Sequence, residues 1–175
     1  MKNIIGLVIG LVIIFIIVIL LILYVIKVHI TKKKIRTALQ TIDSAKDNIG
    51  LYLSDKKDLI LKTRDLLDDE YKESFDSVNF DNYEGEELIS LLDDFNKKFD
   101  EELINNDNYL KDDNIYKIND EIRDNNSCIN ASLKFYNDSV NNYYELKKKC
   151  HGIRLFCRFK KINLYEIKET SSNLN

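Results

Sequence analysis

The sequence contains no proline, no tryptophan and only five glycines among its 175 residues. Sandwiches and barrels with many turns, and nucleotide-binding folds built on glycine-rich loops, need more of these residues. Helices are therefore the favoured structure. At this length one soluble domain is the most that the chain can form.

Acidic residues are absent from the first 36 positions, which carry six lysine and arginine residues. The remaining 139 residues contain 20 basic and 29 acidic side chains, a net charge of −9. The net charge of −3 for the whole chain therefore hides two parts that are suited to different surroundings.

A long apolar run accounts for the first part. The 23 residues from Ile4 to Ile26 carry no charge, and about 20 apolar residues span the hydrocarbon core of a bilayer. A cleaved signal peptide is the alternative, but its apolar region is only about 7–15 residues long and precedes small residues, whereas Lys27 follows here. We expect a transmembrane helix over residues 4–26, after a short extracytoplasmic N-terminus over residues 1–3.

Basic residues beside the span predict its orientation. Five follow it closely, namely Lys27, Lys32, Lys33, Lys34 and Arg36. Because positively charged flanks stay in the cytoplasm, we expect a cell membrane protein with its N-terminus outside and its larger part in the cytoplasm. Gly6 and Gly10 form a G-x-x-x-G pair, a motif that is common in membrane spans and that would suit a homodimer.

Cysteine usage agrees with a cytoplasmic location, because the three cysteines are odd in number and form no C-x-x-C pair. Cys150, His151 and Cys157 come nearest to a metal site, but no second pair of ligands has the spacing of a zinc site. Buried apolar thiols, including Cys128, are the favoured interpretation. No metal and no cofactor are expected.

Beyond the span, apolar residues recur in steps of three and four, as on one face of a helix. Only Gly50 weakens a helix between residues 27 and 73, so one long helix is expected there. Residues 74–84 lose the period and are expected to form a turn. The apolar stripe of this helix consists of Ile35, Ala38, Leu39, Ile42, Ala45, Ile49, Tyr52, Leu53, Leu59, Ile60, Leu66 and Leu67.

Two more helices are expected. A shorter one follows Gly85 and ends at the asparagine-rich stretch at 105–108, with Leu88, Leu92, Phe95, Phe99 and Leu103 on one face. A third begins near residues 111–115. It carries a stripe of residues at intervals of seven, formed by Ile115, Ile122, Ile129, Tyr136, Tyr143 and Cys150. The adjacent row is formed by Ile118, Leu133 and Val140.

The expected fold is all-α, with the transmembrane helix followed by an elongated antiparallel bundle of two long helices and one shorter helix over residues 27–150. A lone coiled coil is the alternative. The bundle is favoured because all three stripes lie in one chain and their connections are short enough for antiparallel neighbours.

The third helix and the C-terminal segment carry a family resemblance. Residues 135–144 read Phe-Tyr-Asn-Asp-Ser-Val-Asn-Asn-Tyr-Tyr and are followed by Phe159-Lys160-Lys161 and Tyr165-Glu166. They resemble the end of LemA-family proteins, which read Y-N-x-x-V-x-x-Y-N, then F-P, then G-F-K and F-E. The matching positions are Tyr136, Asn137, Val140, Tyr143, Phe159, Tyr165 and Glu166.

A second match lies in the first helix, where Ile49, Leu53, Lys56, Asp58, Leu59 and Ile60 resemble the family's I-x-x-x-L-x-x-R-x-D-L-I. The chain resembles a diverged member, because Leu61, Lys62, Leu133, Tyr144 and the pair Cys150-His151 depart from the family pattern. The resemblance implies a single-span membrane protein with an external N-terminus, a cytoplasmic helical bundle, and no established activity or cofactor.

The residues themselves suggest structural roles for these positions. Tyr136 and Tyr143 lie one heptad apart on the packing face, which favours core aromatic residues with partners for their hydroxyl groups. Asp58 is expected to cap or pair locally. The sequence contains no G-x-S-x-G, P-loop or H-E-x-x-H motif, so no catalytic residue and no enzyme are expected.

Basic residues return after the third helix. Residues 147–168 have a net charge of +7, against −15 for residues 37–146. A candidate contact surface is formed by Lys147, Lys148, Lys149, Arg154, Arg158, Lys160 and Lys161.

Two interpretations of this basic, amphipathic segment, residues 151–175, are open. It binds an anionic membrane or an acidic partner, or it covers the far end of the bundle and neutralises its acidic wall. The second is favoured, because three helices of alternating direction would leave the segment about 50 Å or more from its own bilayer.

The sequence therefore predicts a membrane-anchored interaction or scaffold module that binds other proteins and no nucleic acid. The alternative is an accessory subunit that regulates a membrane enzyme such as a protease, with the span as its contact element.

Overall fold

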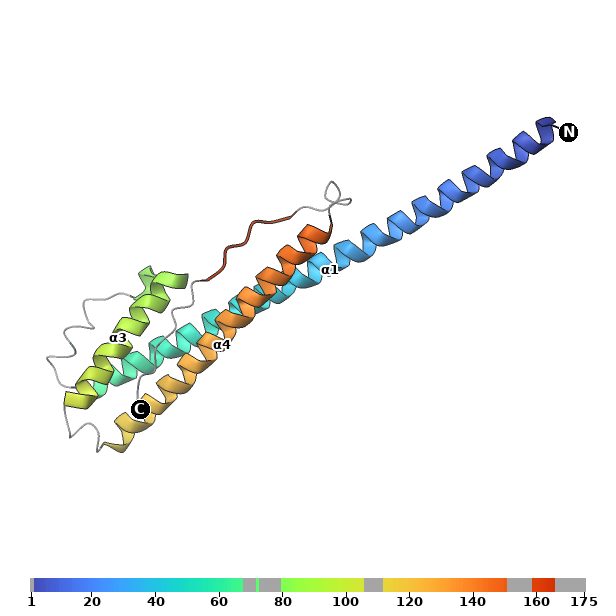
Figure 1. The fold of residues 1–175 in the computed structure, drawn as a ribbon. Coiled ribbons are helices and arrows are strands. Elements are labelled where there is room, and N and C mark those ends of the chain that lie inside the picture. Colours follow the sequence, from blue (N-terminus) through green and yellow to red (C-terminus); the bar gives the residue numbers. More distant parts are fainter. Residues whose placement is uncertain (1, 68–71, 73–79, 106–111, 151–158, 166–175) are drawn as a thin grey trace. The chain divides into compact units, whose positions relative to one another are not determined.

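The computed structural model describes residues 2–67, 72, 80–105, 112–150 and 159–165, and no strand occurs among them. Their elements are α1 (Lys2–Leu66), the short 3₁₀ helix η1 (Phe80–Asn82), α3 (Gly85–Asn105) and α4 (Asp113–Lys149). The expected all-α class, with two long helices and one shorter helix, is confirmed (Figure 1).

Helix α1 runs without interruption for 65 residues. The hydroxyl groups of Thr37 and Thr41 donate to main-chain carbonyls four residues earlier, at 3.1 and 3.0 Å, so neither threonine disturbs the helix. Leu67 closes it with a hydrogen bond from its N–H to the carbonyl of Arg64 at 3.3 Å. The expected continuation to residue 73 and most of the expected turn at 74–84 lie outside the described residues.

Within the part that the structure describes, α1 is the one helix that is long and apolar enough to cross a membrane. Its large apolar side chains at Ile4 and from Leu7 to Ile26 are exposed, from 38% at Tyr24 to 68% at Ile4. A Cβ atom added at Gly6 or Gly10 would meet no atom within 4 Å. The described large apolar side chains of this segment therefore pack against no other part of the chain.

The chain divides into two compact units, each of which takes part of α1 and part of α4. Unit 1 consists of Met1–Thr41 and Ser139–Ile162, and unit 2 of Ile42–Asp138 and Asn163–Asn175. The boundary in α1 thus falls after Thr41, whereas the sequence suggested a change at the end of the span.

Unit 2 has a core supplied by three helices. In α1, buried residues follow one another in steps of three and four: Ile42, Ala45, Ile49, Leu53, Lys56, Ile60, Thr63 and Leu67. The expected faces of the other helices are confirmed, with Leu92, Phe95, Phe99 and Leu103 of α3 and Ile115, Ile122, Ile129, Leu133 and Tyr136 of α4 buried. Leu66 was wrongly assigned to the stripe. It is 43% exposed, because the step from Ile60 to Leu67 passes through Thr63.

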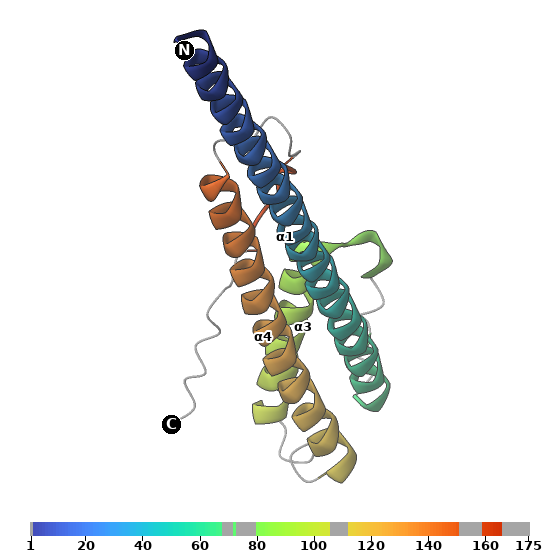
Figure 2. The same cartoon turned by 90° about the vertical axis from the view of Figure 1, so that its right-hand side faces the viewer.

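The direction of α3 differs from the expected alternation. Lys56 of α1 pairs with Asp93, and the later residues Ile60 and Thr63 line one hollow with Phe95 and Phe99, so α1 and α3 run parallel in unit 2. Helix α4 runs opposite to both (Figures 1 and 2). The 17 residues between Leu67 and Gly85 reach about 55 Å when extended, enough to return along a 21-residue helix of about 30 Å.

Local signals fix where α3 and α4 begin. Gly85 has φ 58°, a left-handed conformation that glycine adopts at little cost, and α3 starts there with Glu86 and Glu87 in its first turn. The carboxylate of Asp112 accepts the N–H groups of Asn114 and Ile115 at 2.8 and 3.3 Å, which makes Asp112 the N-cap of α4.

Unit 1 joins the start of the chain to the end of α4. Ile35 of α1 is buried, as are Val140, Tyr143 and Cys150 at the end of α4, and the last turns of α4 run beside α1 in both views (Figures 1 and 2). Because α4 returns along α1, the basic residues at its end share a unit with the apolar segment. The expected separation of about 50 Å from the bilayer depended on alternating helix directions, and the structure does not show that alternation.

Candidate functional site

One buried cation lies in the core of unit 2. Lys56 is 1% exposed and its Nζ donates to Oδ1 of Asp93 on α3 at 2.5 Å. The Asp93 side chain is 35% exposed, so water reaches the anion but not the cation. Asp58, the other charged residue of this matched stretch, lies on the exposed face of α1 and does not join the pair.

Asp100 extends this polar region along α3. Burial raises the pKa of its carboxyl above the ordinary value, and the positive charges of Arg123 and Lys56 oppose that rise. Asn96, one turn earlier, donates from Nδ2 to Oδ2 of Asp100 at 3.3 Å. The three helices are therefore joined by charge as well as by apolar packing.

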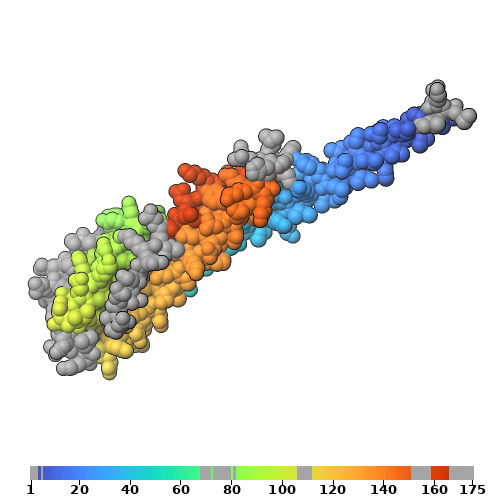
Figure 3. Space-filling model, viewed as in Figure 1, coloured from blue at the N-terminus to red at the C-terminus, as the bar shows by residue number. Residues whose placement is uncertain are grey.

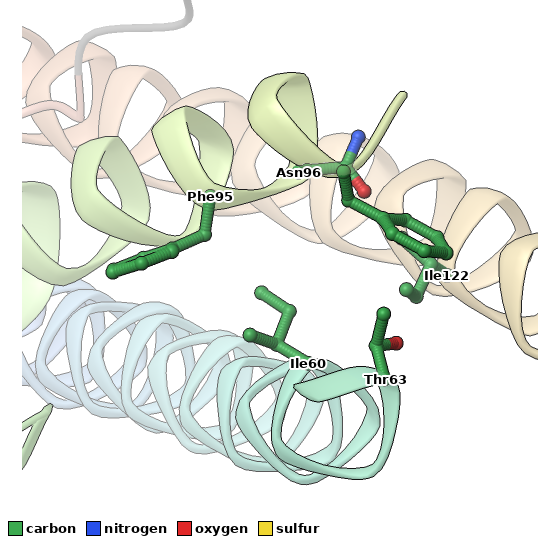
Figure 4. Close-up of a pocket in the computed structure, with 6 residues that line it drawn as sticks. Ile60, Thr63, Phe95, Asn96 and Ile122 are labelled. Atoms are coloured by element: carbon green, nitrogen blue, oxygen red, sulfur yellow. The ribbon is translucent and has the colours of Figure 1, made fainter. Parts of the chain in front are cut away.

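The hollow beside this region holds no ligand-sized space. Its walls are Ile60 and Thr63 of α1, Phe95, Asn96 and Phe99 of α3, and Ile122 of α4. Figure 4 shows Ile60 and Thr63 directed from α1 toward α3. The space is too narrow for a water molecule. The Thr63 hydroxyl donates to the Leu59 carbonyl at 2.9 Å, which leaves its methyl group for packing.

The C-terminal segment is bound to α4 through its main chain. In unit 2, Nδ2 of Asn137 donates to the carbonyl of Tyr165 at 2.9 Å, and Oδ1 accepts the N–H of the same residue at 2.9 Å. The Tyr136 hydroxyl donates to the carbonyl of Asn163 at 3.0 Å. The rings of Tyr136 and Tyr165 meet edge to face, with centroids 4.9 Å apart.

Unit 1 repeats this arrangement seven residues later in α4. The Tyr143 hydroxyl accepts the N–H of Lys160 at 2.8 Å and donates to its carbonyl at 3.1 Å. The Tyr144 hydroxyl does the same for Ile162, at 3.0 and 2.7 Å. Figure 3 shows the segment 159–165 (red) on the surface of α4 (orange).

Side chains of α4 thus take the place of a neighbouring strand. An extended segment needs partners for its main-chain N–H and C=O groups, and among the described residues these partners come from a helix. Because the contacts are to main chain, the side chains of Lys160, Lys161 and Leu164 are free to be exposed, and all three are. We call residues 159–165 the docked tail.

Aromatic rings and a lysine complete the contact in unit 1. The ring of Phe159 lies 6.1 Å from that of Tyr143, between centroids. Nζ of Lys147 lies 5.5 Å from the Tyr144 ring centroid and 5.8 Å from that of Phe159, within cation–π range. Burial raises the pKa of Tyr143, which the hydrogen bond with Lys160 opposes, so the hydroxyl keeps the proton that it donates.

A groove of about 450 Å³ opens beside the tail in unit 2. It is lined by Lys46, Glu86, Tyr136 and residues 163–165. Burial, followed by the negative charge of Glu86, raises the pKa of the Tyr165 hydroxyl. The groove therefore offers one cation, one anion and a protonated phenol.

The cysteines occupy different environments. Cys128 is exposed and Cys150 is buried, and both are free thiols, so the expected burial holds for Cys150 and is wrong for Cys128. Cys157 and His151 lie outside the described residues. The structure therefore does not test a metal site formed by these two residues and Cys150. Elsewhere in the described part of the chain, no three metal-binding side chains come together.

The structure brings the predicted positions together in separate groups. The core of unit 2 contains the matching positions of α1, namely Ile49, Leu53, Lys56, Leu59 and Ile60. The tail is contacted in unit 2 by Tyr136 and Asn137. Unit 1 contains Val140, Tyr143 and Phe159. Of the predicted contact surface, Lys147–Lys149, Lys160 and Lys161 are described in unit 1. Arg154, Arg158 and Glu166 lie outside the described residues.

Three residues that form polar contacts in the structure were not predicted from the sequence. No role was assigned to Asp93 or Asp100 from the sequence, and only the step of three from Leu53 to Lys56 signalled a buried cation that needs an anion. Tyr144 was regarded as a departure from the family pattern, although its hydroxyl holds the tail.

Comparison with known proteins adds no relative. No family model matches the chain, and neither a curated protein nor a solved structure matches it.

Proposed function

We propose that this protein is a single-pass cell membrane protein whose helical bundle acts in the cytoplasm as an interaction module for other proteins. The observation that carries the proposal is the continuity of α1. The helix that exposes an apolar surface from Ile4 to Ile26 also supplies the buried stripe of unit 2. A membrane that holds the first part would therefore hold the bundle beside it.

Charge supports both the placement and the role. Unit 1 carries 13 basic residues and one acidic residue, whereas unit 2 carries 13 basic and 28 acidic residues, a net charge of −15. Basic residues beside a span favour the cytoplasmic side. A strongly acidic unit attracts partners with basic surfaces, which makes protein binding the proposed role.

Membership of the LemA family is part of the proposal. Residues that carry the resemblance meet pairwise, Asn137 with Tyr165 and Tyr143 with Phe159. These matching positions lie far apart in the sequence but touch in the structure. Such contacts are suited to preserving a fold. These contacts support a shared framework with structural, non-catalytic motif residues.

Photo-crosslinking in cells tests the interaction module. A photoreactive amino acid at Tyr116, which is 62% exposed on α4, should capture a discrete set of proteins. Replacing the exposed Asp120 and Asp124 by asparagine should weaken that capture, and replacing the exposed Lys134 by glutamine should not. Identical capture by all three proteins, or none from the parent, would count against the proposal.

The alternative is an accessory subunit that acts through its span. It is favoured by the open surface around Gly6 and Gly10, which would also suit a homodimer. Exchange of residues 4–26 for an unrelated span distinguishes the interaction module from the accessory subunit. An interaction module keeps its crosslinked partners after the exchange, and a subunit that contacts an enzyme through the span loses them.

A further inference from the structure

Unit 1 gathers positive charge from parts of the chain that are distant in sequence. Its 13 basic residues include Lys27 and four others just beyond the apolar segment, and seven at the end of α4 and in the stretch that follows. Its one acidic residue, Glu145, accepts a hydrogen bond from Lys148 at 2.7 Å, and this bond lowers the pKa of Glu145. The unit therefore has a net charge of +12.

Docking of the tail increases this concentration of charge. The hydrogen bonds from Tyr143 to Lys160 and from Tyr144 to Ile162 hold Lys160 and Lys161 on the last turns of α4, where Lys149 is exposed too. Like charges that are brought together repel one another. A counter-charge from outside unit 1 would relieve this cost, because the unit has almost none of its own.

The short distance between the apolar segment and the buried part of unit 1 identifies the source of that counter-charge. Ile35, which is buried in unit 1, lies nine residues beyond Ile26, or about 14 Å along a helix. Lipid headgroups cover about 5–7 Å beyond the hydrocarbon core, so the end of α4 lies about one Debye length, ~8 Å, from them. Any other polyanion would have to enter this gap.

We propose that unit 1 binds the anionic lipid headgroups of the leaflet from which α1 emerges, through Lys32–Lys34 of α1 together with Lys149, Lys160 and Lys161 of the α4 end and docked tail. The inference rests on the proposed span. Each lysine near an anionic leaflet strengthens attraction about fivefold. The docked tail then belongs to the membrane-facing surface instead of covering the far end of a bundle.

The test uses the full chain in nanodiscs of mixed phosphatidylcholine and phosphatidylglycerol. Spin-labelled versions of the two lipids report the preference of the protein for the anionic one. We compare the parent with the tail variant K149Q/K160Q/K161Q, an α1 variant K32Q/K33Q/K34Q, and the matched control K62Q/K97Q/K134Q, which removes three exposed lysines of unit 2. The tail variant leaves every main-chain hydrogen bond of the tail available.

The parent and the matched control should prefer phosphatidylglycerol equally. The tail and α1 variants, which each lose three lysines, should lower that preference by at least about fivefold, the effect of one lysine. An unchanged lipid preference in the tail variant would overturn the inference. Self-association of the parent protein without any preference for phosphatidylglycerol would overturn it too. Failure of the parent to enter nanodiscs would instead reject the span, and with it the proposed function. Insertion without lipid preference would reject this inference alone.

Discussion

The carboxamide of Asn137 pairs with both main-chain polar groups of Tyr165, each at a donor-to-acceptor distance of 2.9 Å. A neighbouring strand would form a similar pair of bonds, but here the partner is a helix side chain. The two hydroxyl groups of Tyr143 and Tyr144 do the same for Lys160 and Ile162. Docking of the tail is therefore independent of most of its own side chains.

Replacement of Asn137 by alanine should release the end of the docked tail. Each hydrogen bond contributes about 0.5–1.5 kcal/mol, so the loss of two should speed hydrogen exchange of the Tyr165 amide by a factor of about 5 to 150. Exchange followed by mass spectrometry measures this, with the exposed Asn141 replaced by alanine as the control. Equal protection of Tyr165 in both variants would show that Asn137 does not hold the tail.

Helix positions and core stripes could be predicted from the sequence because they depend on local periodicity. All six residues of the expected heptad stripe, from Ile115 to Cys150, are buried, and α3 begins at Gly85, one residue before the predicted start. Periodicity identifies a buried face but not the neighbour that covers it. The direction of α3 could not be predicted, since a 17-residue connection is long enough for either direction.

The contacts of the tail lay beyond sequence reasoning for a different reason. Residues 159–165 have neither a helical nor an alternating pattern, because main-chain contacts place few demands on side chains. The hydroxyl partners expected for Tyr136 and Tyr143 exist, as the carbonyls of Asn163 and Lys160. Their identity depends on a chain reversal outside any local pattern.

The Lys56–Asp93 pair should respond unequally to removal of its two members. Asp93→Ala would leave a buried cation without its nearest anion and should cost about 2–3 kcal/mol of the free energy of unfolding. Lys56→Met keeps the apolar volume and leaves an anion that water reaches, so it should change stability by about 1 kcal/mol or less.

Urea unfolding of the full chain in detergent measures both changes, with the exposed Asp94 replaced by alanine as a control. The double variant Lys56→Met/Asp93→Ala should recover most of the loss seen for Asp93→Ala. Equal losses for the two single variants would contradict the proposed asymmetry.

Asp100 should make stability depend on pH. Its folded pKa is raised, chiefly by burial, so ionisation costs more in the folded than in the unfolded chain. The stability due to the protonated form is present below the ordinary pKa and is lost as pH rises through the raised value. Asp100→Asn removes this loss, so its stability relative to the parent should increase from acidic toward neutral pH. A difference in the free energy of unfolding that stays constant over this range would exclude the effect.

Two glycines should respond in opposite ways to alanine. Gly50 lies inside α1, and an added Cβ would meet nothing within 4 Å, so Gly50→Ala should stabilise the chain by about 0.5–1 kcal/mol. Gly85 has φ 58°, which strains an L residue, so Gly85→Ala should destabilise it by about 1 kcal/mol. Thermal unfolding of the two variants provides the comparison, and a shift of the same sign in both would contradict it.

The orientation of the protein can be read from its own cysteines. Cys128 is exposed and Cys150 is buried, so replacing Cys157 by serine leaves Cys128 as the reactive thiol and Cys150 as an internal control. If unit 2 lies in the cytoplasm, a membrane-impermeant maleimide should label Cys128 only after the cells are lysed, and Cys150 only after denaturation. Labelling of Cys128 in intact cells would place unit 2 outside and reverse the proposed topology. Because Cys128 reacts without unfolding, a negative result in intact cells reports the membrane barrier and not burial of the thiol.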